Sequence, residues 1–179
     1  MKLLVHLCCA NCAAAPLQQL LLDDFSLKGL WFNPNIHPAP EYEARRTSVE
    51  DLARLWSLDI EYEESLSQDS FLSCVAGKGA ARCEVCYSVR LGKTAELARR
   101  IGMDGFTTTL LVSPYQNFDK IREIGMRAAR MHNTSFLASD FRPYFRRSQA
   151  TGRELGFYRQ KHCGCLHSEK ERSAGKKAR

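Results

Sequence analysis

The sequence has no uninterrupted apolar run near the roughly 20 residues that a helix needs to cross a bilayer, so we expect no membrane partner. It also lacks a glycine-rich phosphate loop after its first apolar segment, which argues against a bound nucleotide. The N-terminal run MKLLVHLCC has no small-residue cleavage site, and we expect a buried strand there instead of a signal peptide. These absences predict a cytoplasmic protein.

Acidic residues are sparse near the C-terminus, where basic residues are crowded. The formal net charge is +6, from 26 Lys and Arg against 20 Asp and Glu, and the surplus lies in roughly the last forty residues. Such a basic surface favours a polyanionic partner, and its candidate contacts are Arg142, Arg146, Arg147 and Arg159. We expect residues 1–172 to form one domain and residues 173–179 to form a solvated, partly disordered basic tail.

Cysteine is the residue that this sequence has in abundance. Seven of its eight cysteines stand in three clusters, which are Cys8-Cys9-Ala10-Asn11-Cys12, Cys83-Glu84-Val85-Cys86 and Cys163-Gly164-Cys165. In a reducing compartment, grouped thiols indicate metal binding or catalysis more than structural disulfides. Cys74 stands alone, and we expect it to be a small buried residue.

Strands and helices are predicted to alternate along the chain. The apolar pattern predicts strands over residues 2–7, 29–33, 60–63, 106–112 and 136–137. A helix with Pro16 in its first turn follows the first cysteines, and further helices are expected over residues 41–58, from Cys83 to Ile101, and through Ile121 and Ala128. This order predicts an α/β fold, a single-domain parallel sheet flanked by helices.

Several chemistry-bearing segments directly follow predicted strands. In open parallel sheets ligands bind beyond the carboxyl ends of the strands. We therefore expect one shared rim, formed by the first cysteine cluster and by residues 33–37, 113–117 and 140–142.

The cysteine spacing alone leaves several kinds of site open. The two Cys-x-x-Cys pairs could hold a structural zinc ion or a four-iron cluster, and spacing alone favours zinc. The extra thiols, Cys8 and the Cys163–Cys165 pair, and the position of the first cluster on the rim favour iron–sulfur chemistry. A thioredoxin-type dithiol at Cys9 and Cys12 is a further alternative, although it leaves the other clustered cysteines unexplained.

Other side chains are weaker candidates. His162 adjoins Cys163 and could be a ligand or an acid, while His6 and His37 are expected to be packed or hydrogen-bonded residues. Asp140 could act as a general acid or a substrate anchor, although a cap or an ion pair is the commoner role of such a residue. Tyr115 could donate a proton or stack on a base.

Together these motifs are similar to the QueH family of epoxyqueuosine reductases. The resemblance runs from residue 4 to about residue 165 and rests on segments in the family's order, which are LVHLCCANC, NPNIHP followed by Glu41-Tyr42, RCEVCY, TTTLLVSPY, DFR and YRQKHCGC. Some relatives carry Asp where this chain has Cys12, and many carry Pro at Asn11. The Asn11 amide could hydrogen-bond a cluster sulfur.

The resemblance implies a fold related to the nucleotide-binding HUP proteins. It also implies two-electron reduction of the epoxide of epoxyqueuosine in tRNA to the alkene, the last step of queuosine formation. An external electron donor, a [4Fe–4S] cluster and a second metal ion, taken as iron, would be required.

On this interpretation each side chain receives a role. The cluster ligands are expected to be Cys9, Cys12, Cys83 and Cys86, and the second metal would be held by Cys8, Cys163 and Cys165, although Cys8 and Cys9 could exchange roles. The catalytic candidates are Asp140, Tyr115 and His162. Two rival hypotheses are a non-catalytic zinc module that binds RNA and a thiol-redox or sulfur-transfer enzyme.

Overall fold

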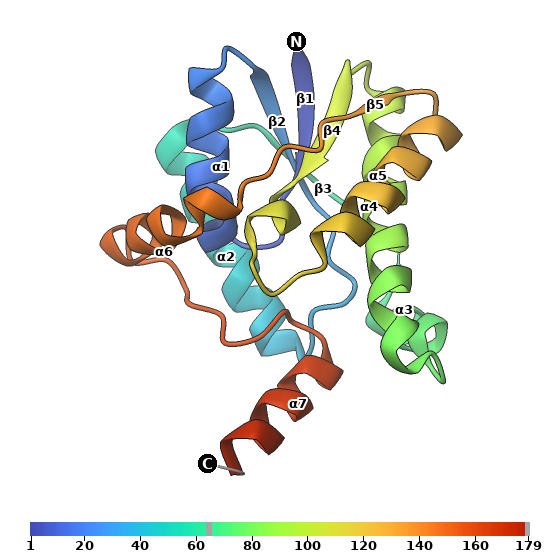
Figure 1. Ribbon diagram of the computed structural model, residues 1–179. Helices are drawn as coiled ribbons and strands as arrows, with labels where there is room; N and C mark the ends of the chain where they lie inside the picture. The colour runs from blue at the N-terminus through green and yellow to red at the C-terminus, as the bar shows by residue number, and fades with distance from the viewer. Residues whose placement is uncertain (64–65, 178–179) are drawn as a thin grey trace.

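The protein forms one parallel sheet covered by helices on both faces (Figure 1). The computed structural model describes residues 1–63 and 66–177. The strands lie in the order β3-β2-β1-β4-β5 and all pair in parallel; they are β1 Lys2–His6, β2 Ser26–Trp31, β3 Ile60–Tyr62, β4 Gly105–Thr108 and β5 Ser135–Phe136. The predicted α/β class with a parallel sheet is confirmed, and the strand order is that of Rossmann-like folds.

The helices follow the strands in alternation. They are α1 Ala10–Leu22, α2 Ala39–Trp56, α3 Gln68–Val75, α4 Arg82–Arg100, α5 Phe118–Met131, α6 Phe145–Glu154 and α7 Leu166–Lys177. Helices α1, α2 and α6 lie on one side of the sheet, and α4 and α5 lie on the other (Figure 1). Helix α7 continues through the predicted boundary at residue 173, and residues 178–179 of the expected tail lie outside the described residues.

The core lies where the central strands meet the apolar faces of the helices. Leu3, Leu4 and Phe106 are fully buried because β1 and β4 are covered on both faces. On α5, Ile121 and Ala128 occupy one face of the helix and pack into the same core. None of the helices in the described part of the chain is long and apolar enough to span a membrane.

Three local expectations are corrected by the structure. The strand predicted over residues 106–112 ends at Thr108, because the Thr108 side chain accepts a hydrogen bond from the Leu110 amide and starts a 3₁₀ helix, Thr109–Val112. Pro16 lies in the second turn of α1 and not the first, because the helix already begins at Ala10. Cys74 is exposed on α3 and is not a buried residue.

Candidate metal centre

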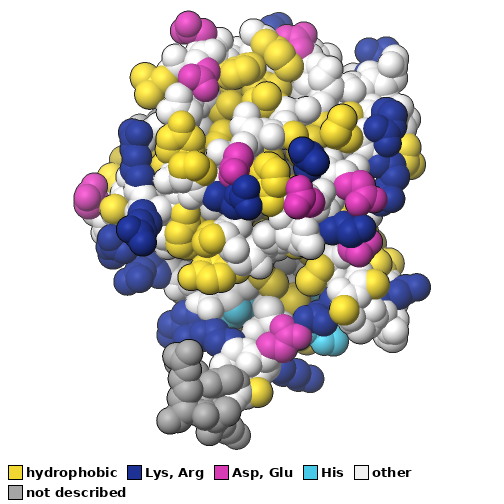
Figure 2. Space-filling model, in the orientation of Figure 1, with side chains coloured by type: hydrophobic (Ala, Val, Ile, Leu, Met, Phe, Trp, Pro, Cys, Tyr) yellow, Lys and Arg dark blue, Asp and Glu magenta, His cyan; other side chains and the backbone are white. Residues whose placement is uncertain are grey.

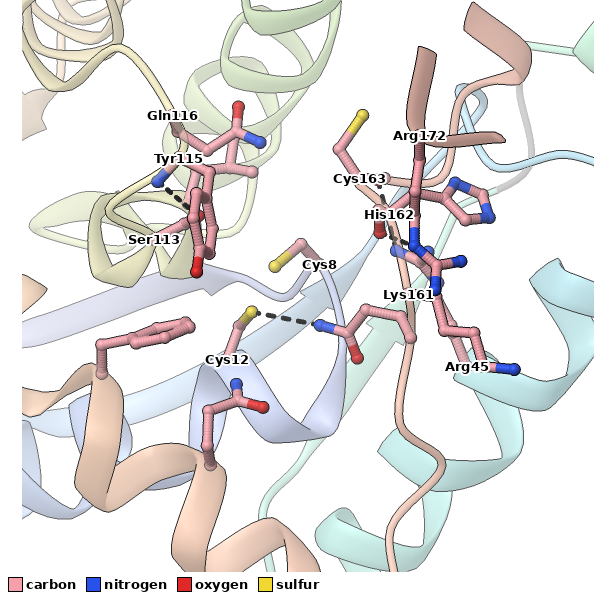
Figure 3. A pocket seen from close by; sticks show the side chains of 14 residues that line it. Cys8, Cys12, Arg45, Ser113, Tyr115, Gln116, Lys161, His162, Cys163 and Arg172 are labelled. Carbon is pink, nitrogen blue, oxygen red and sulfur yellow. Dashed lines mark hydrogen bonds between the residues drawn. The ribbon is translucent and has the colours of Figure 1, made fainter. Parts of the chain in front are cut away.

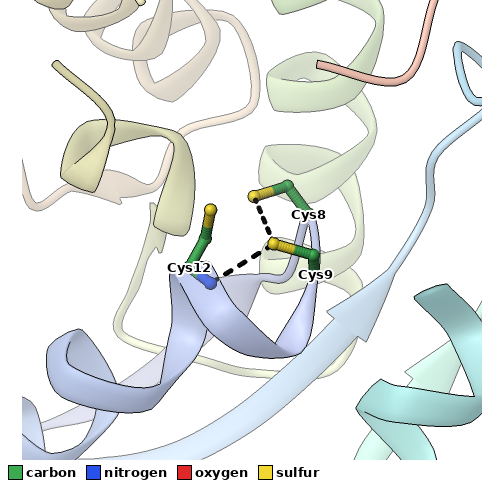
Figure 4. Close-up of side chains that lie close together, drawn as sticks. All are labelled: Cys8, Cys9 and Cys12. Atoms are coloured by element: carbon green, nitrogen blue, oxygen red, sulfur yellow. Dashed lines mark hydrogen bonds between the residues drawn. The ribbon is translucent and has the colours of Figure 1, made fainter. Parts of the chain in front are cut away.

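The first thiol group consists of Cys8, Cys9 and Cys12, at the carboxyl end of β1. Their sulfur atoms all lie within 4.8 Å of one another, and all three side chains are buried (Figure 4). The Sγ atoms of Cys8 and Cys9 are 4.0 Å apart. A compact set of three buried thiols is the donor set that zinc, copper(I) and iron–sulfur clusters require.

The turn between β1 and α1 fixes these thiols. Cys9 is the N-cap of α1, and its Sγ accepts a hydrogen bond of 3.2 Å from the Cys12 amide. The Cys8 amide donates to Thr109 Oγ1 at 3.0 Å, and that hydroxyl lies 3.3 Å from Cys8 Sγ. The chain therefore presents the sulfurs at a helix N-terminus, where the partial positive charge favours thiolate.

Hydrogen bonding and burial shift the pKa values of the three thiols in different directions. Hydrogen bonding with the thiols of Cys12 and Cys9 holds the pKa of Cys8 well below its usual range. Contact with Cys8 raises the pKa of Cys12, and burial raises the pKa of Cys9. Binding of a metal would displace the protons of these thiols.

A glutamine from the far end of the chain contacts this group. The Gln160 side-chain amide lies 2.7 Å from Cys9 Sγ and 3.4 Å from Cys12 Sγ, and it donates to these sulfurs. Its own carbonyl lies 3.3 Å from the Asn11 amide nitrogen, and that nitrogen also donates to the Tyr158 carbonyl. Asn11 therefore acts on the cysteine sulfurs through Gln160, and a direct contact of its amide with a cluster sulfur stays a prediction.

The second thiol group joins α4 to the segment after α6. Cys83, Cys86, Cys163 and Cys165 line one small cavity of about 30 Å³, and the Sγ atoms of Cys163 and Cys165 are 3.6 Å apart. Hydrogen bonding with Cys163 lowers the pKa of Cys165 to about 4, while burial raises the pKa of Cys83 and of Cys86. Four thiols around a small cavity also suit a soft metal.

The structure therefore groups the cysteines differently from the sequence-based assignment. That assignment combined Cys9 and Cys12 with the α4 pair, whereas the structure places Cys8 with them and places the α4 pair beside Cys163 and Cys165. The spacing of short motifs fixes pairs of ligands but not which pairs meet in space. The two groups are neighbours, since Gln116 and Cys163 line both the small cavity and the larger one described next.

A cavity of about 460 Å³ opens above the first thiol group. In Figure 3 the side chains of Cys8 and Cys12 lie between Tyr115 on one side and Cys163 and His162 on the other. The lining residues are Cys8, Cys12, Arg45, Leu110, Ser113, Tyr115, Gln116, Phe145, Gln149, Gln160, Lys161, His162, Cys163 and Arg172. A ligand in this cavity would meet thiols at its base and cationic and amide groups on its walls.

The C-terminal thiol segment docks on α2 through a buried ion pair. Arg45 donates to Glu41 Oε1 at 2.6 Å, and both side chains are largely buried. The same guanidinium donates to the backbone carbonyls of His162 at 2.9 Å and Cys163 at 3.2 Å. Gly164, at a φ of +111°, permits this close approach, because an added Cβ would lie 3.2 Å from Arg45 Nη1.

The predicted catalytic residues are placed in different surroundings. His162 and Tyr115 line the large cavity. Burial and the Arg45 charge lower the pKa of His162, and Tyr115 is 85% exposed with its ring packed edge-on against Phe145. Asp140 does not line the cavity; it accepts two side-chain hydrogen bonds from Arg142, at 2.8 and 2.7 Å, and these bonds lower its pKa.

The predicted histidine roles agree with the structure. His6 is fully buried, and its Nδ1 lies 2.9 Å from Thr108 Oγ1. Burial and the nearby Arg90 charge lower the pKa of His6 to about 3, so the ring is neutral at physiological pH. His37 is also buried, next to the ring of Phe71.

The predicted phosphate contacts fall into two sets. Arg146, Arg147 and Arg159 are exposed, on α6 and in the loop that follows it, whereas Arg142 is engaged by Asp140. Figure 2 shows Lys and Arg side chains over α6 and also over the opposite edge of the molecule near α5. The side chains of Lys176, Lys177 and Arg179 lie outside the described residues.

Sequence reasoning missed several residues of the site. Gln160 stood within the last quoted motif without a role, and Lys161 and Arg172 counted only as part of the crowded basic residues near the C-terminus. Arg45 and Gln149 carried no local signal. Gly152 was also missed; a Cβ there would collide with the Asn11 side-chain oxygen, so this glycine lets α6 pack on α1. These residues act through long-range packing, which no short motif encodes.

The fold and the site define an α/β protein of Rossmann-like topology whose sheet edge carries a thiol-rich centre suited to soft metals. The family model described as "Epoxyqueuosine reductase QueH" matches residues 3–171. The chain belongs to this family of oxidoreductases, and the resemblance seen in the motifs is confirmed.

Curated relatives agree with the family match over most of their length. A protein named epoxyqueuosine reductase QueH from Dehalococcoides mccartyi is 32% identical over 96% of this chain and 94% of its own. The proteins of the same name from Thermotoga maritima and Streptococcus pyogenes are 35% and 32% identical, over 94% of this chain and 91% and 71% of their own lengths.

Proposed function

We propose that this protein reduces epoxyqueuosine in tRNA to queuosine, with the thiol groups holding a [4Fe–4S] cluster and a second metal ion, which we take to be iron. The observation that carries the proposal is the set of three buried thiols at the base of a cavity of about 460 Å³. The relatives' names supply the substrate, and the thiols supply the reason for a redox metal.

The donor set supports two centres. One would be held by Cys8, Cys9 and Cys12, and the other by the four cysteines of the small cavity. A bound cluster would supply single electrons, and a metal ion beside it would act as a Lewis acid on the epoxide oxygen. The chain's own groups hold the sulfurs with amide and hydroxyl hydrogen bonds and leave the cavity open above them.

The cavity walls provide groups that fit the substrate. Gln149 and Gln116 can hydrogen-bond the hydroxyls of a cyclopentane ring or the edge of a base, while Lys161 and Arg172 bring positive charge near a phosphate backbone. His162 is the proposed proton-handling group of this wall, and the exposed ring of Tyr115 is the proposed platform on which a base can stack.

Asp140 keeps a proposed role only as a group that positions Arg142. Its two hydrogen bonds to that guanidinium, and its place outside the cavity, favour an ion pair over proton donation. Arg146, Arg147 and Arg159 are the proposed contacts to tRNA phosphates. The electrons would come from an external donor, and we place the reaction in the cytoplasm, where tRNA is found.

The test is anaerobic reconstitution followed by metal and activity measurements. We expect iron with acid-labile sulfide, a broad visible absorption, and conversion of epoxyqueuosine to queuosine in tRNA when a chemical reductant is added. Mössbauer spectra would separate cluster iron from a mononuclear ion. Stoichiometric zinc without iron, or iron without any conversion of the tRNA, would overturn the proposal.

A further inference from the structure

In residues 1–63 and 66–174, whose burial the structure describes, two arginines are buried, and only one of these two has a carboxylate partner. Arg45 is 2% exposed and is paired with Glu41, whereas Arg90 on α4 is 3% exposed. In the described part of the chain no Asp or Glu forms an ion pair with Arg90. A buried, permanently charged guanidinium without an anion is strongly unfavourable, so its counter-charge must lie elsewhere.

The partners of Arg90 are neutral acceptors and a sulfur. Its Nη2 donates to Asn33 Oδ1 at 2.7 Å, and its Nε lies 3.3 Å from His6 Nε2. Its Nη1 is 3.8 Å from Cys86 Sγ. The Asn33 amide in turn donates to the Leu7 carbonyl at 2.9 Å, so this network joins the segments that follow β1 and β2, and Leu7 directly precedes Cys8 of the first thiol group.

The position of Arg90 relates it to both thiol groups. Cys86 belongs to the small cavity that Arg90 also lines, and His6 immediately precedes the Leu7–Cys8 turn. The Arg90 charge acts on Cys8 as well as on Cys86. Thiolates of the two groups that hold a metal would therefore supply the negative charge that the Arg90 guanidinium lacks.

We propose that Arg90 is the internal counter-ion of the two thiol groups and raises the reduction potential of the metal centre that they hold. The proposal rests on the proposed function, because it requires a redox metal at these thiols. A fixed positive charge in a dry site stabilises the more negative, reduced state of a nearby centre. Arg90 is therefore a positioning residue that acts through electrostatics and need not contact the substrate.

The experiment compares reduction potentials of four loaded variants with wild type. Arg90→Gln removes the charge, and Arg90→Lys keeps it without the planar fork. Asn33→Asp leaves Arg90 in place. It puts a carboxylate where the Asn33 amide oxygen accepts the hydrogen bond from Arg90 Nη2. Arg99→Gln removes an exposed arginine from the last turn of the same helix and is the matched control.

Dye-equilibrated anaerobic titrations, followed by visible absorption, give the result. We expect Arg90→Gln and Asn33→Asp each to lower the reduced-to-oxidised ratio at a fixed potential by about tenfold or more. Arg90→Lys should remain close to wild type, and Arg99→Gln should be unchanged. Iron and sulfide content are measured beside each titration.

The outcomes separate the two claims. Wild-type protein that takes up no iron would overturn the proposed function itself. Wild-type protein with iron, together with either Arg90→Gln or Asn33→Asp at the wild-type potential, would overturn the role of Arg90 alone. A similar shift in Arg99→Gln would show a general effect of surface charge and would also overturn it.

Discussion

The side-chain amide of Gln160 donates a hydrogen bond of 2.7 Å to Cys9 Sγ, although 151 positions separate the two residues in the sequence. This bond ties the loop after α6 to the first turn of α1. Hydrogen bonds to ligand sulfurs stabilise thiolates and tune the metals that they hold. Gln160 therefore couples the placement of the C-terminal segment to the chemistry of the first thiol group.

Replacing Gln160 should weaken metal retention without unfolding the protein. In Gln160→Leu the sulfurs lose their amide donor, and we expect about tenfold faster loss of iron to a chelator, at the lower end of the usual effect of such partners. Gln149→Leu is the matched control, because Gln149 lines the same cavity but donates to no thiol among the described residues. Equal iron loss in both variants would contradict the role of the Gln160 bond.

Serine variants distinguish the two thiol groups from a single shared centre. A serine hydroxyl is a poor replacement for a thiolate on a soft metal. If Cys12 and Cys83 belong to different centres, Cys12→Ser and Cys83→Ser should lose different components of the Mössbauer spectrum, and both should be inactive. Loss of the same component in both variants would support the assignment predicted from the sequence, in which Cys12 and Cys83 hold the same cluster. Cys74→Ser, at an exposed and isolated thiol, should keep all of its iron.

The sequence was informative where periodicity and turns act locally. The buried β1 strand, the helix that begins after the first cysteines and the parallel order all follow from short patterns. The end of β4 was mispredicted because the apolar run continues through Leu110 and Leu111, which are buried in a 3₁₀ helix and not in a strand. Apolar character reports burial, but not the backbone conformation that achieves it.

The site could be predicted in part only. The cysteines were found because grouped thiols are rare outside metal and redox sites. Which cysteines lie together depends on how the loop after α6 docks on α2. Arg45 makes this contact by donating to the carbonyls of His162 and Cys163, which are 117 and 118 positions away in the sequence. The role of Arg90 could not be predicted from the sequence. It depends on burial without an ion-pairing carboxylate among the described residues, which becomes apparent only in the packed structure.

Asp140→Asn should leave turnover close to the wild-type value. Arg142 holds the pKa of Asp140 below its usual range, so the group is an ionised carboxylate at neutral pH and a poor proton donor. Because this pKa is lowered on folding, the ion pair adds stability above the unfolded pKa, and that stability is lost as pH falls through the folded pKa. Kinetics on epoxyqueuosine-containing tRNA test this. A large fall in kcat with unchanged iron content would restore Asp140 as a general acid.

Two substitutions at Tyr115 separate its hydroxyl from its ring. In the described part of the chain no residue hydrogen-bonds the hydroxyl, whereas Phe145 packs against the ring with centroids 5.9 Å apart. We expect Tyr115→Phe to keep near-normal kcat and KM. Tyr115→Ala should raise KM by roughly five- to 150-fold, since stacking contributes about 1–3 kcal/mol per base. A low kcat in Tyr115→Phe with normal KM would identify the hydroxyl as a proton donor instead.

Charge reversal around α6 should weaken tRNA binding and flatten its dependence on salt. Arg146, Arg147 and Arg159 are exposed, and each phosphate contact that is lost should lower the slope of log affinity against log salt by about one unit. The triple Glu variant is titrated with epoxyqueuosine-containing tRNA at several salt concentrations.

In the matched control the charge of three exposed arginines on α5 is reversed by substitution with Glu. Helix α5 lies on the other side of the sheet (Figure 1). Arg122, Arg127 and Arg130 give the same change in net charge, so long-range repulsion is equal in the two proteins. Because only direct contacts release counterions one by one, the slope should change in the α6 variant and stay near wild type in the α5 variant. Equal slopes in all three proteins would place the tRNA on another face, and a flatter slope in the α5 variant alone would place it on the face opposite to α6.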